Sequence, residues 1–430
     1  MIKRDAYIQE LEPFIDKPFI KVLTGIRRCG KSSILLLLMD DLKQKGIPDD
    51  HVIYINFDNL ENSELRNSKA LHSHVKKMMN GNGSYHILLD EIQEVENWEQ
   101  AVNSMLLDER ADIYITGSNS RLLSSELATY IAGRYVEFRI RPLSFGEFLQ
   151  FRAAYGPAEK HGGITGSFGG SAGAGKPVTA GNAGIAAAGK DLEAFIRLGG
   201  FPAIHTGVYT EEESYRIVSD IYASAILRDT IQRQKIRNVE LLERIVKFVF
   251  DNVGNTFSAK SIADYFRSQL RRPDPETVYN YLNALEAAFI IKRIPRYDLR
   301  GKEILKTQEK YYAGDHALPF ALAGYRDRLI SGVLENMVLH DLERRGYRVF
   351  TGRLGETEID FVGERRDGKI YVQVAYTLEA ESTIEREFKS LLKIKDQYPK
   401  YVVSLDTFFR ENYEGVRYMP LGEFLLSGNV

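Results

Sequence analysis

The sequence predicts an α/β protein that begins with a parallel sheet flanked by helices and continues into smaller modules. Between residues 18 and 117, short β-rich apolar runs alternate with helical stretches, as in a parallel sheet. The chain has 430 residues, too many for one ordinary core, so we expect two to three domains. A change in the helix pattern after residue 239 indicates where a second module starts.

The composition narrows the function classes. Hydrophobic residues make up 44% and charged residues 27% of the chain, and the formal net charge is −2. This balance gives no global attraction to nucleic acid or acidic lipid, so any such surface must be local. The longest aliphatic run, 34–39, is far shorter than the roughly 20 residues of a membrane span. A single cysteine excludes an intrachain disulfide, and we expect a cytoplasmic protein without a membrane segment.

Each predicted strand of the first sheet ends in polar or glycine residues. The apolar runs lie at 19–24, 52–57, 86–89 and 113–116. Ligands of α/β proteins usually bind at the carboxyl ends of such strands. The residues that follow the runs are therefore the candidate site residues.

The first run leads into a phosphate-binding loop. Residues 25–32 match the pattern G-x-x-x-x-G-K-S, which lies between a strand and a helix. Such a loop curls its backbone amides around a triphosphate, so Lys31 would neutralise the β- and γ-phosphates of ATP and Ser32 would bind Mg²⁺. The expected nucleotide-binding residues are Gly25, Ile26, Arg27, Arg28, Cys29, Gly30, Lys31, Ser32 and Ser33. We interpret Cys29, the only thiol, as a packing residue beside the nucleotide.

The run at 86–89 delivers two carboxylates about 60 residues after the loop. Asp90 is the expected second magnesium ligand, together with Ser32, and Glu91 is the expected general base for the attacking water. An Asp-Glu pair is also common at solvated strand ends. Its position after a buried strand favours the catalytic interpretation.

Two further candidates are less specific. Asn119, or alternatively Ser118, follows the next strand and could hydrogen-bond the attacking water. Arg134 precedes another apolar run and could act on a neighbouring subunit's phosphate, which would require a homo-oligomer. The competing interpretation of Asn119 and Ser118 is a turn without a catalytic role. The competing interpretation of Arg134 is a surface ion pair.

Taken together, these motifs resemble the AAA-type prokaryotic P-loop ATPases that carry an uncharacterised C-terminal domain. The similar elements also include 132–134, the Arg-Pro-Leu-Ser-Phe-Gly-Glu-Phe stretch at 141–148 and Gly-Gly-Phe-Pro at 199–202. The resemblance implies ATP hydrolysis, a winged helix and a restriction-endonuclease-like tail. The expected regions are an ATPase core at 1–150, a flexible Gly/Ala-rich insertion at 151–190, a helical lid or connector at 191–238, a winged helix at 239–315 and the tail at 325–430.

The predicted winged helix carries a mild positive charge. Between residues 260 and 310, eleven basic residues stand against seven acidic ones, a difference of 11 − 7 = +4. This excess suits phosphate contacts with duplex or branched DNA, made by the third helix and the wing. A protein-docking module or a rigid spacer is the alternative.

The tail resembles a metal-dependent nuclease core with one departure. Glu335, Asp360 and Gln373 follow in the expected order, but Ala375 stands where a lysine would stabilise the transition state. Lys369 and Glu358 lie nearby in sequence without occupying the motif positions. We therefore predict a nuclease-like fold with little or no cleavage.

The leading functional hypothesis is Mg²⁺-dependent ATP hydrolysis coupled to binding or remodelling of DNA. The alternatives are an ATP-dependent switch that binds a protein partner and an ATP-gated nuclease. The sequence does not distinguish between a motor and a switch.

Overall fold

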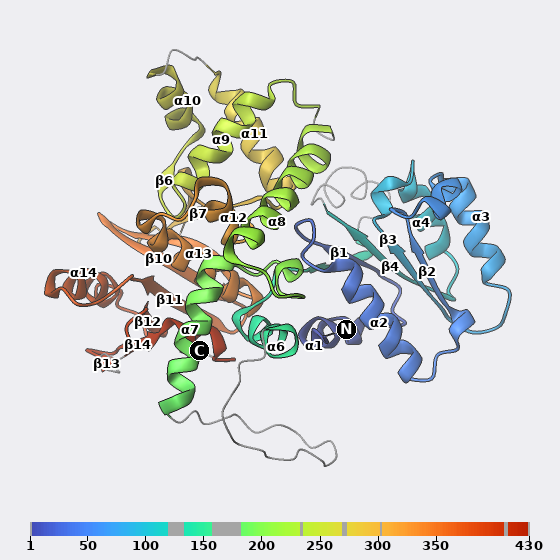
Figure 1. The fold of residues 1–430 in the computed structure, drawn as a ribbon, viewed down its shortest axis with the longest axis horizontal. Coiled ribbons are helices and arrows are strands. Elements are labelled where there is room, and N and C mark those ends of the chain that lie inside the picture. Colours follow the sequence, from blue (N-terminus) through green and yellow to red (C-terminus); the bar gives the residue numbers. More distant parts are fainter. Residues whose placement is uncertain are drawn as a thin grey trace.

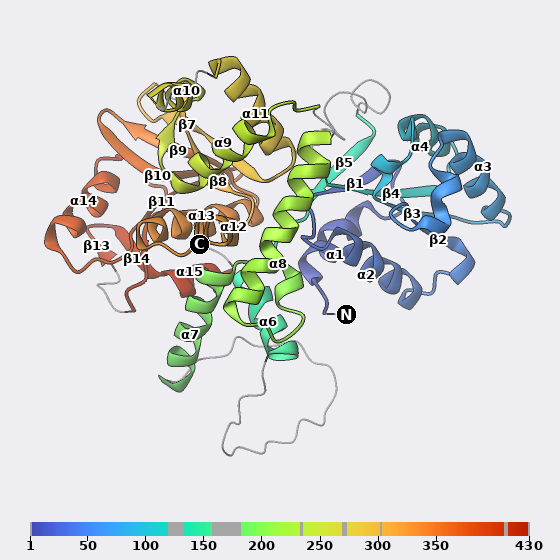
Figure 2. The same ribbon diagram turned by 45° about the horizontal axis from the view of Figure 1, so that its top comes forward.

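A computed structural model describes residues 2–118, 133–156, 182–232, 235–268, 273–301, 303–407 and 412–428. Two sheets occupy opposite sides of the molecule, and helices α6 (Phe145–Tyr155) and α8 (Glu211–Ser224) lie between them (Figures 1 and 2). None of the helices in the described ranges combines the length and apolar character needed to cross a bilayer.

The first sheet has five strands, all parallel, in the order β2-β3-β4-β1-β5. This arrangement confirms the predicted parallel sheet with flanking helices. The strands are β1 (Ile20–Thr24), β2 (Val52–Asn56), β3 (Tyr85–Asp90), β4 (Ala111–Gly117) and β5 (Tyr135–Arg139). Because β1, β3 and β4 are neighbours, the loops after their carboxyl ends meet at one edge of the sheet.

Helices cover both faces of this sheet. Helix α2 (Lys31–Gln44) buries leucine and isoleucine side chains against one face, together with α1 (Asp5–Leu11). Helices α3 (Ser68–Met78) and α4 (Trp98–Leu106) bury their apolar sides against the other. The buried strands read as continuous apolar runs because both of their faces are covered.

The helical connector comprises α6, α7 (Asn182–Leu198), α8 and the π-helix η7 (Ala225–Gln232), with a 3₁₀ turn at Pro202–Ile204. A capping box between Ser144 and Glu147 fixes the start of α6. The segment predicted as an insertion, 151–190, is helical at both of its described ends, because α6 runs to Tyr155 and α7 begins at Asn182. Residues 157–181 lie outside the described part of the chain.

The C-terminal half is built on a nine-stranded sheet in the order β13-β14-β12-β11-β10-β9-β7-β8-β6. The three helices and the hairpin expected at 239–315 are present, and β7 of that hairpin pairs in parallel with β9 of the tail. The hairpin and the tail strands are thus hydrogen-bonded into one sheet. The elements are α9 (Val239–Asp251), β6 (Thr256–Phe257), α10 (Ala259–Ser268), α11 (Pro275–Ala287), β7 (Ile291–Asp298), β8 (Glu303–Ala313), α12 (Ala317–Ala323), α13 (Ile330–Arg344), β9 (Arg348–Leu354), β10 (Thr357–Arg365), β11 (Gly368–Val374), α14 (Glu381–Leu392), β12 (Lys400–Ser404), β13 (Asn412–Tyr413), β14 (Val416–Pro420) and α15 (Leu421–Leu426).

Direct polar contacts join the two halves. Arg344 of α13 donates to the carbonyl oxygen of Pro142 at 2.6 Å. The amide of Gly200 donates to the carboxylate of buried Asp315 at 2.8 Å. Pro142 and Gly200 belong to the stretches 141–148 and 199–202 that carry the family resemblance, and both stretches contact the C-terminal half.

Candidate nucleotide site

The loop between β1 and α2 requires glycine at two positions. Gly25 has a φ of 150°, and a Cβ atom there would lie 2.1 Å from the carbonyl oxygen of Ile140. Gly30 has a φ of 103° and forms the N-cap of α2. Both backbone conformations are ones that L-residues with side chains rarely adopt. The backbone amides of the loop and of the N-terminus of α2 therefore lie close together, which favours binding of an anion.

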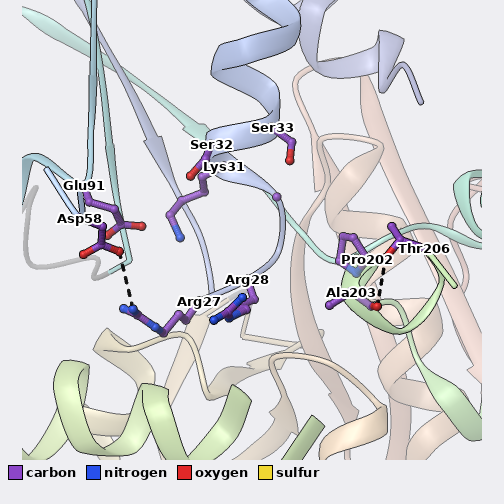
Figure 3. Close-up of a pocket in the computed structure, with 11 residues that line it drawn as sticks. Arg27, Arg28, Lys31, Ser32, Ser33, Asp58, Glu91, Pro202, Ala203 and Thr206 are labelled. Atoms are coloured by element: carbon purple, nitrogen blue, oxygen red, sulfur yellow. Dashed lines mark hydrogen bonds and ion pairs between the residues drawn. The ribbon is translucent and has the colours of Figure 1, made fainter. Parts of the chain in front are cut away.

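Lys31 is held inside this loop. Its side chain is buried, and Nζ donates hydrogen bonds to the carbonyl oxygens of Gly25 at 3.1 Å and Ile26 at 3.4 Å. The ammonium group lies beside the open pocket in Figure 3. A bound phosphate would offer it charged oxygens in place of neutral carbonyls, which makes the lysine a prepared anion ligand.

Asp90 ends β3 and is surrounded by neutral donors. Its Oδ1 accepts from Ser32 Oγ at 3.1 Å and from Thr116 Oγ1 at 2.6 Å, and its Oδ2 accepts from Tyr54 Oη at 3.0 Å and Asn56 Nδ2 at 3.1 Å. Burial raises the pKa of this carboxyl group, whereas the hydrogen bonds from Thr116 and Ser32 act in the opposite direction.

This donor set fits a magnesium ion. A serine hydroxyl and a carboxylate are the hard oxygen ligands that Mg²⁺ prefers, and Ser32 Oγ and Asp90 Oδ1 lie 3.1 Å apart. All four hydrogen-bond donors that reach Asp90 are uncharged. A cation is thus the natural counterion of this carboxylate.

Glu91 follows Asp90 in a left-handed backbone conformation, with φ of 56°. Such a conformation is uncommon for a residue with a side chain and clusters at functional positions. The amide of Glu91 donates to Thr116 Oγ1 at 2.8 Å, and Gln93 donates to its carboxylate. The sharp turn directs the Glu91 side chain into the pocket, while Asp90 stays buried behind it.

The residues enclose an open pocket of about 400 Å³. Asp58 and Glu91 lie on one side of it, and Pro202, Ala203 and Thr206 lie on the other (Figure 3). The Thr206 hydroxyl donates to the Ala203 carbonyl oxygen at 3.2 Å, which stabilises that second wall. The other lining residues are Arg27, Arg28, Gly30, Lys31, Ser32 and Ser33.

Two of the loop residues turn away from the pocket. The Cys29 side chain is fully buried, and its Sγ lies 3.3 Å from the carbonyl oxygen of Ile140. Burial raises the pKa of this thiol. Ile26 is buried as well and approaches Gly314, which follows β8 of the C-terminal half. The only thiol therefore packs in the core, as interpreted from the sequence, and does not line the pocket.

The predicted positions after β4 and before β5 lie elsewhere. Ser118 is buried, and its hydroxyl donates to Asp229 of η7 at 2.8 Å. Asn119 lies outside the described residues. Arg134 is exposed and sits just before β5, where its carbonyl oxygen accepts from the amide of Ile20 at the start of β1. That end of the sheet is opposite the phosphate loop, so Arg134 does not reach the pocket of its own chain.

Sequence reasoning missed several groups that shape the site. Asp229 lies within 3.9 Å of Arg27 in the phosphate loop, and Arg27 also approaches Asp58 at 3.9 Å. The other missed groups are Tyr54, Asn56 and Thr116 around Asp90, and Ala203 and Thr206 in the pocket wall. Polar residues at the ends of apolar strands signalled Asn56 and Thr116, but nothing near Asp229 in the sequence marks it.

Comparisons with known proteins agree with the fold and the loop. Residues 17–149 match the model of an AAA domain, and residues 189–329 match a domain of unknown function. The parallel sheet and the phosphate loop thus define a P-loop ATPase of the AAA type. An uncharacterized protein of Haemophilus influenzae is 34% identical over 427 residues, which cover 99% of each chain. The chain belongs to the same family as that protein.

Two further similarities are to proteins of Methanocaldococcus jannaschii and Pyrococcus abyssi. An uncharacterized protein of Methanocaldococcus jannaschii is 31% identical over 394 residues, covering 88% of this chain and 79% of that protein. The solved structure of a Walker-type ATPase of Pyrococcus abyssi covers 75% of this chain and 96% of its own, with a TM-score of 0.49 and 14% identity. That last similarity is too low to carry an argument about shared function.

Proposed function

We propose that this chain hydrolyses ATP with Mg²⁺ and couples the reaction to DNA bound by its C-terminal half. The observation that supports hydrolysis is the convergence of three groups on one pocket. Lys31 and Ser32 arrive from the loop, and Glu91 arrives beside them from the end of β3. Phosphoryl transfer needs little beyond positioning and charge stabilisation, which these groups supply.

Each residue has a defined task in this reaction. Lys31 would bind the β- and γ-phosphates, and Ser32 with Asp90 would hold Mg²⁺, which supplies charge neutralisation for the triphosphate. Glu91 would orient the attacking water and accept its proton. On the opposite wall, Pro202, Ala203 and Thr206 offer an apolar surface with a hydroxyl, which suits the base and ribose.

The coupling proposal rests on contacts of the loop with the rest of the chain. Arg27 lies between Asp58, which is partly exposed, and Asp229, which is fully buried in η7. A γ-phosphate would compete with both carboxylates for this arginine. Ile26 meanwhile lies close to Gly314, which follows β8 of the C-terminal half. Nucleotide occupancy can therefore alter contacts to the connector and to the C-terminal sheet.

An Asp229→Asn substitution tests this coupling. Asparagine keeps the acceptor for Ser118 but removes the charge that faces Arg27 at 3.9 Å, so we expect roughly fivefold tighter ATP binding, the size of one weak ion pair. The ATP-induced change in hydrogen exchange of 225–232 should shrink at the same time. Asp220→Asn, an exposed position on α8, is the matched control. Unchanged ATP affinity together with an unchanged exchange response would exclude Asp229 as the link.

DNA contact is supported by a cleft between α9 and α10. The cleft, about 560 Å³, is lined by Arg244, Lys247 and Arg328, by Asp251 and by the half-exposed ring of Tyr265. Arg328 pairs with Asp251 at 3.3 Å and Arg244 pairs with Glu240 at 3.2 Å, both at partly exposed positions. Cations beside an aromatic face suit phosphates and stacked bases. Its position differs from the third helix and wing that the sequence indicated. Of the eleven basic residues counted there, Arg267, Lys292, Arg293 and Lys310 form ion pairs within the chain.

A homo-oligomer is proposed because Arg134 lies far from its own pocket yet is exposed. Arg134→Ala should lower turnover at least about tenfold in the assembled protein, the loss expected for an arginine acting in trans. Mixing Arg134→Ala with Lys31→Ala tests this directly, since one variant keeps an intact nucleotide site and the other keeps the arginine. We expect the mixture to regain ATP turnover. A mixture that hydrolyses no more ATP than its two components would contradict action in trans.

A further inference from the structure

A second polar cavity, of about 450 Å³, opens in the C-terminal sheet, remote from the nucleotide pocket. Four carboxylates from three elements line it. Glu335 of α13 and Glu358 and Asp360 of β10 converge on one point, and Glu387 of α14 pairs with Arg386 at 2.6 Å. Gln373 of β11 adds an amide, and its Oε1 accepts from the Asp360 amide at 3.3 Å. Glu335, Asp360 and Gln373 are the positions that the sequence analysis assigned to a nuclease-like core with alanine at 375, whereas Glu358 lies outside that motif.

A lysine from outside the tail occupies the centre of this group. Lys310 lies on β8 of the hairpin, and its side chain is only 3% exposed. Its Nζ lies 3.2 Å from Glu335 Oε2, 2.9 Å from Glu358 Oε1 and 3.1 Å from Asp360 Oδ1. The Lys310 ammonium group thus lies at nearly the same distance from three carboxylates, one on α13 and two on β10.

The remaining hydrogen bonds fix this arrangement. Tyr312, two residues along β8 from Lys310, donates to Glu335 Oε2 at 2.7 Å. The amide of Val374 donates to Asp360 Oδ2 at 3.0 Å. Both carboxylates therefore have one further donor besides the lysine, which holds each of them in place.

The surrounding carboxylates favour the protonated form of Lys310. Burial alone would lower the pKa of Lys310, but the surrounding carboxylates and Tyr312 raise it well above its ordinary value. Burial raises the pKa of Glu335 to about 8, against the opposing effect of Lys310. One lysine thus faces three carboxylates, and burial makes Glu335 easier to protonate than an ordinary glutamate.

We propose that Lys310 is the resident cation of this cavity, where it neutralises Glu335, Glu358 and Asp360 in the place that a divalent metal ion would otherwise take. A metal bridging the three carboxylates would need the space that Nζ fills. A lysine that stayed nearby would repel it, since two cations a few ångströms apart in a buried site disfavour each other. The carboxylates are thereby kept from forming a metal centre.

The same lysine ties the hairpin to the tail. Lys310 belongs to β8, whereas its partners belong to α13 and β10 on the other side of β9. Together with the pairing of β7 and β9, these ion pairs make the hairpin and the tail one unit. A nucleotide-driven movement would then carry both together, and the hairpin would not swing as a separate wing.

The test compares divalent-ion binding by full-length wild type, Asp360→Asn, Lys310→Ala and the double variant, all without nucleotide. Binding of Mn²⁺ is followed by the electron paramagnetic resonance signal of the free ion, and thermal unfolding is measured with and without Mn²⁺. We expect wild type and Asp360→Asn to bind the same amount of Mn²⁺. Lys310→Ala should unfold at a lower temperature and gain one Mn²⁺ site, with at least roughly tenfold tighter binding at the cavity because a like charge is gone. That site should vanish in the double variant.

Other results would overturn the proposal. If wild type binds one more Mn²⁺ per chain than Asp360→Asn, the cavity is a metal site that tolerates its lysine. If wild type with Mn²⁺ cleaves DNA and Asp360→Asn does not, Lys310 is the lysine of an active nuclease centre. A folded Lys310→Ala protein that gains no Mn²⁺ site would also contradict the proposal. Should Lys310→Ala fail to fold, the comparison of wild type with Asp360→Asn still decides between a resident lysine and a metal.

Discussion

Lys31→Ala should abolish measurable ATP binding. The lysine is the buried cation of the phosphate loop, and its present partners are two neutral carbonyl oxygens. Charge-assisted hydrogen bonds contribute about 1.5–3 kcal/mol each, so loss of the contacts to two phosphates corresponds to an affinity at least about 100-fold lower. Isothermal titration calorimetry with ATP and Mg²⁺ measures this loss directly.

The matched control for this prediction lies on the same helix. Lys43 is an exposed residue near the other end of α2, where it pairs with Asp49. Lys43→Ala removes the same side chain and should leave ATP affinity unchanged. Equal affinities for Lys31→Ala and wild type would show that the nucleotide does not bind in this loop.

Glu91→Gln should bind ATP with wild-type affinity but hydrolyse it about 10²- to 10⁴-fold more slowly, the usual contribution of a general base. The amide can still accept a hydrogen bond but cannot take the proton of the attacking water. Asp90, buried behind it, keeps its four donors, so the metal position should be unaffected. Single-turnover hydrolysis of radiolabelled ATP, with binding measured in parallel, separates the two steps.

A nearby glutamate serves as the control for Glu91. Glu96 lies five residues further on and is exposed, outside the pocket. Glu96→Gln should hydrolyse ATP at the wild-type rate. A Glu91→Gln protein whose single-turnover rate matches that of Glu96→Gln would lose its assignment as the base.

Local chemistry explains why much of the nucleotide site could be predicted from sequence. The phosphate loop depends on glycine conformations and on a strand and a helix that adjoin it in the chain, so a short motif specifies it. Asp90 and Glu91 follow a buried strand, and strand order alone brings them to the loop. The direction of the Cys29 side chain, by contrast, is set by a contact that is distant in the sequence. Its direction depends on the carbonyl group of Ile140, 111 residues away, and no motif encodes that neighbour.

The parts that the sequence did not predict depend on long-range contacts. Asp229 meets Ser118 across 111 residues of chain, and Lys310 meets Asp360 across 50 residues from a different element. A motif search examines only the residue at position 375, which is alanine. It does not detect that Lys310 of the hairpin lies beside the same carboxylates. The count of basic residues has the same limit, because it includes side chains such as Lys310 that are neutralised inside the fold.

We propose that this chain hydrolyses ATP and that DNA bound to its C-terminal half stimulates the reaction. The measurement that tests it most directly is steady-state ATP hydrolysis by wild type with Mg²⁺, alone and with single-stranded, duplex or four-way-junction DNA, at low and moderate salt. We expect Mg²⁺-dependent turnover that one DNA form increases, more strongly at low salt because phosphate contacts are screened by salt. Turnover that ignores every DNA form would remove DNA as the partner and favour an ATP switch that acts on a protein. The absence of ATP hydrolysis under all of these conditions would contradict the proposed ATPase activity.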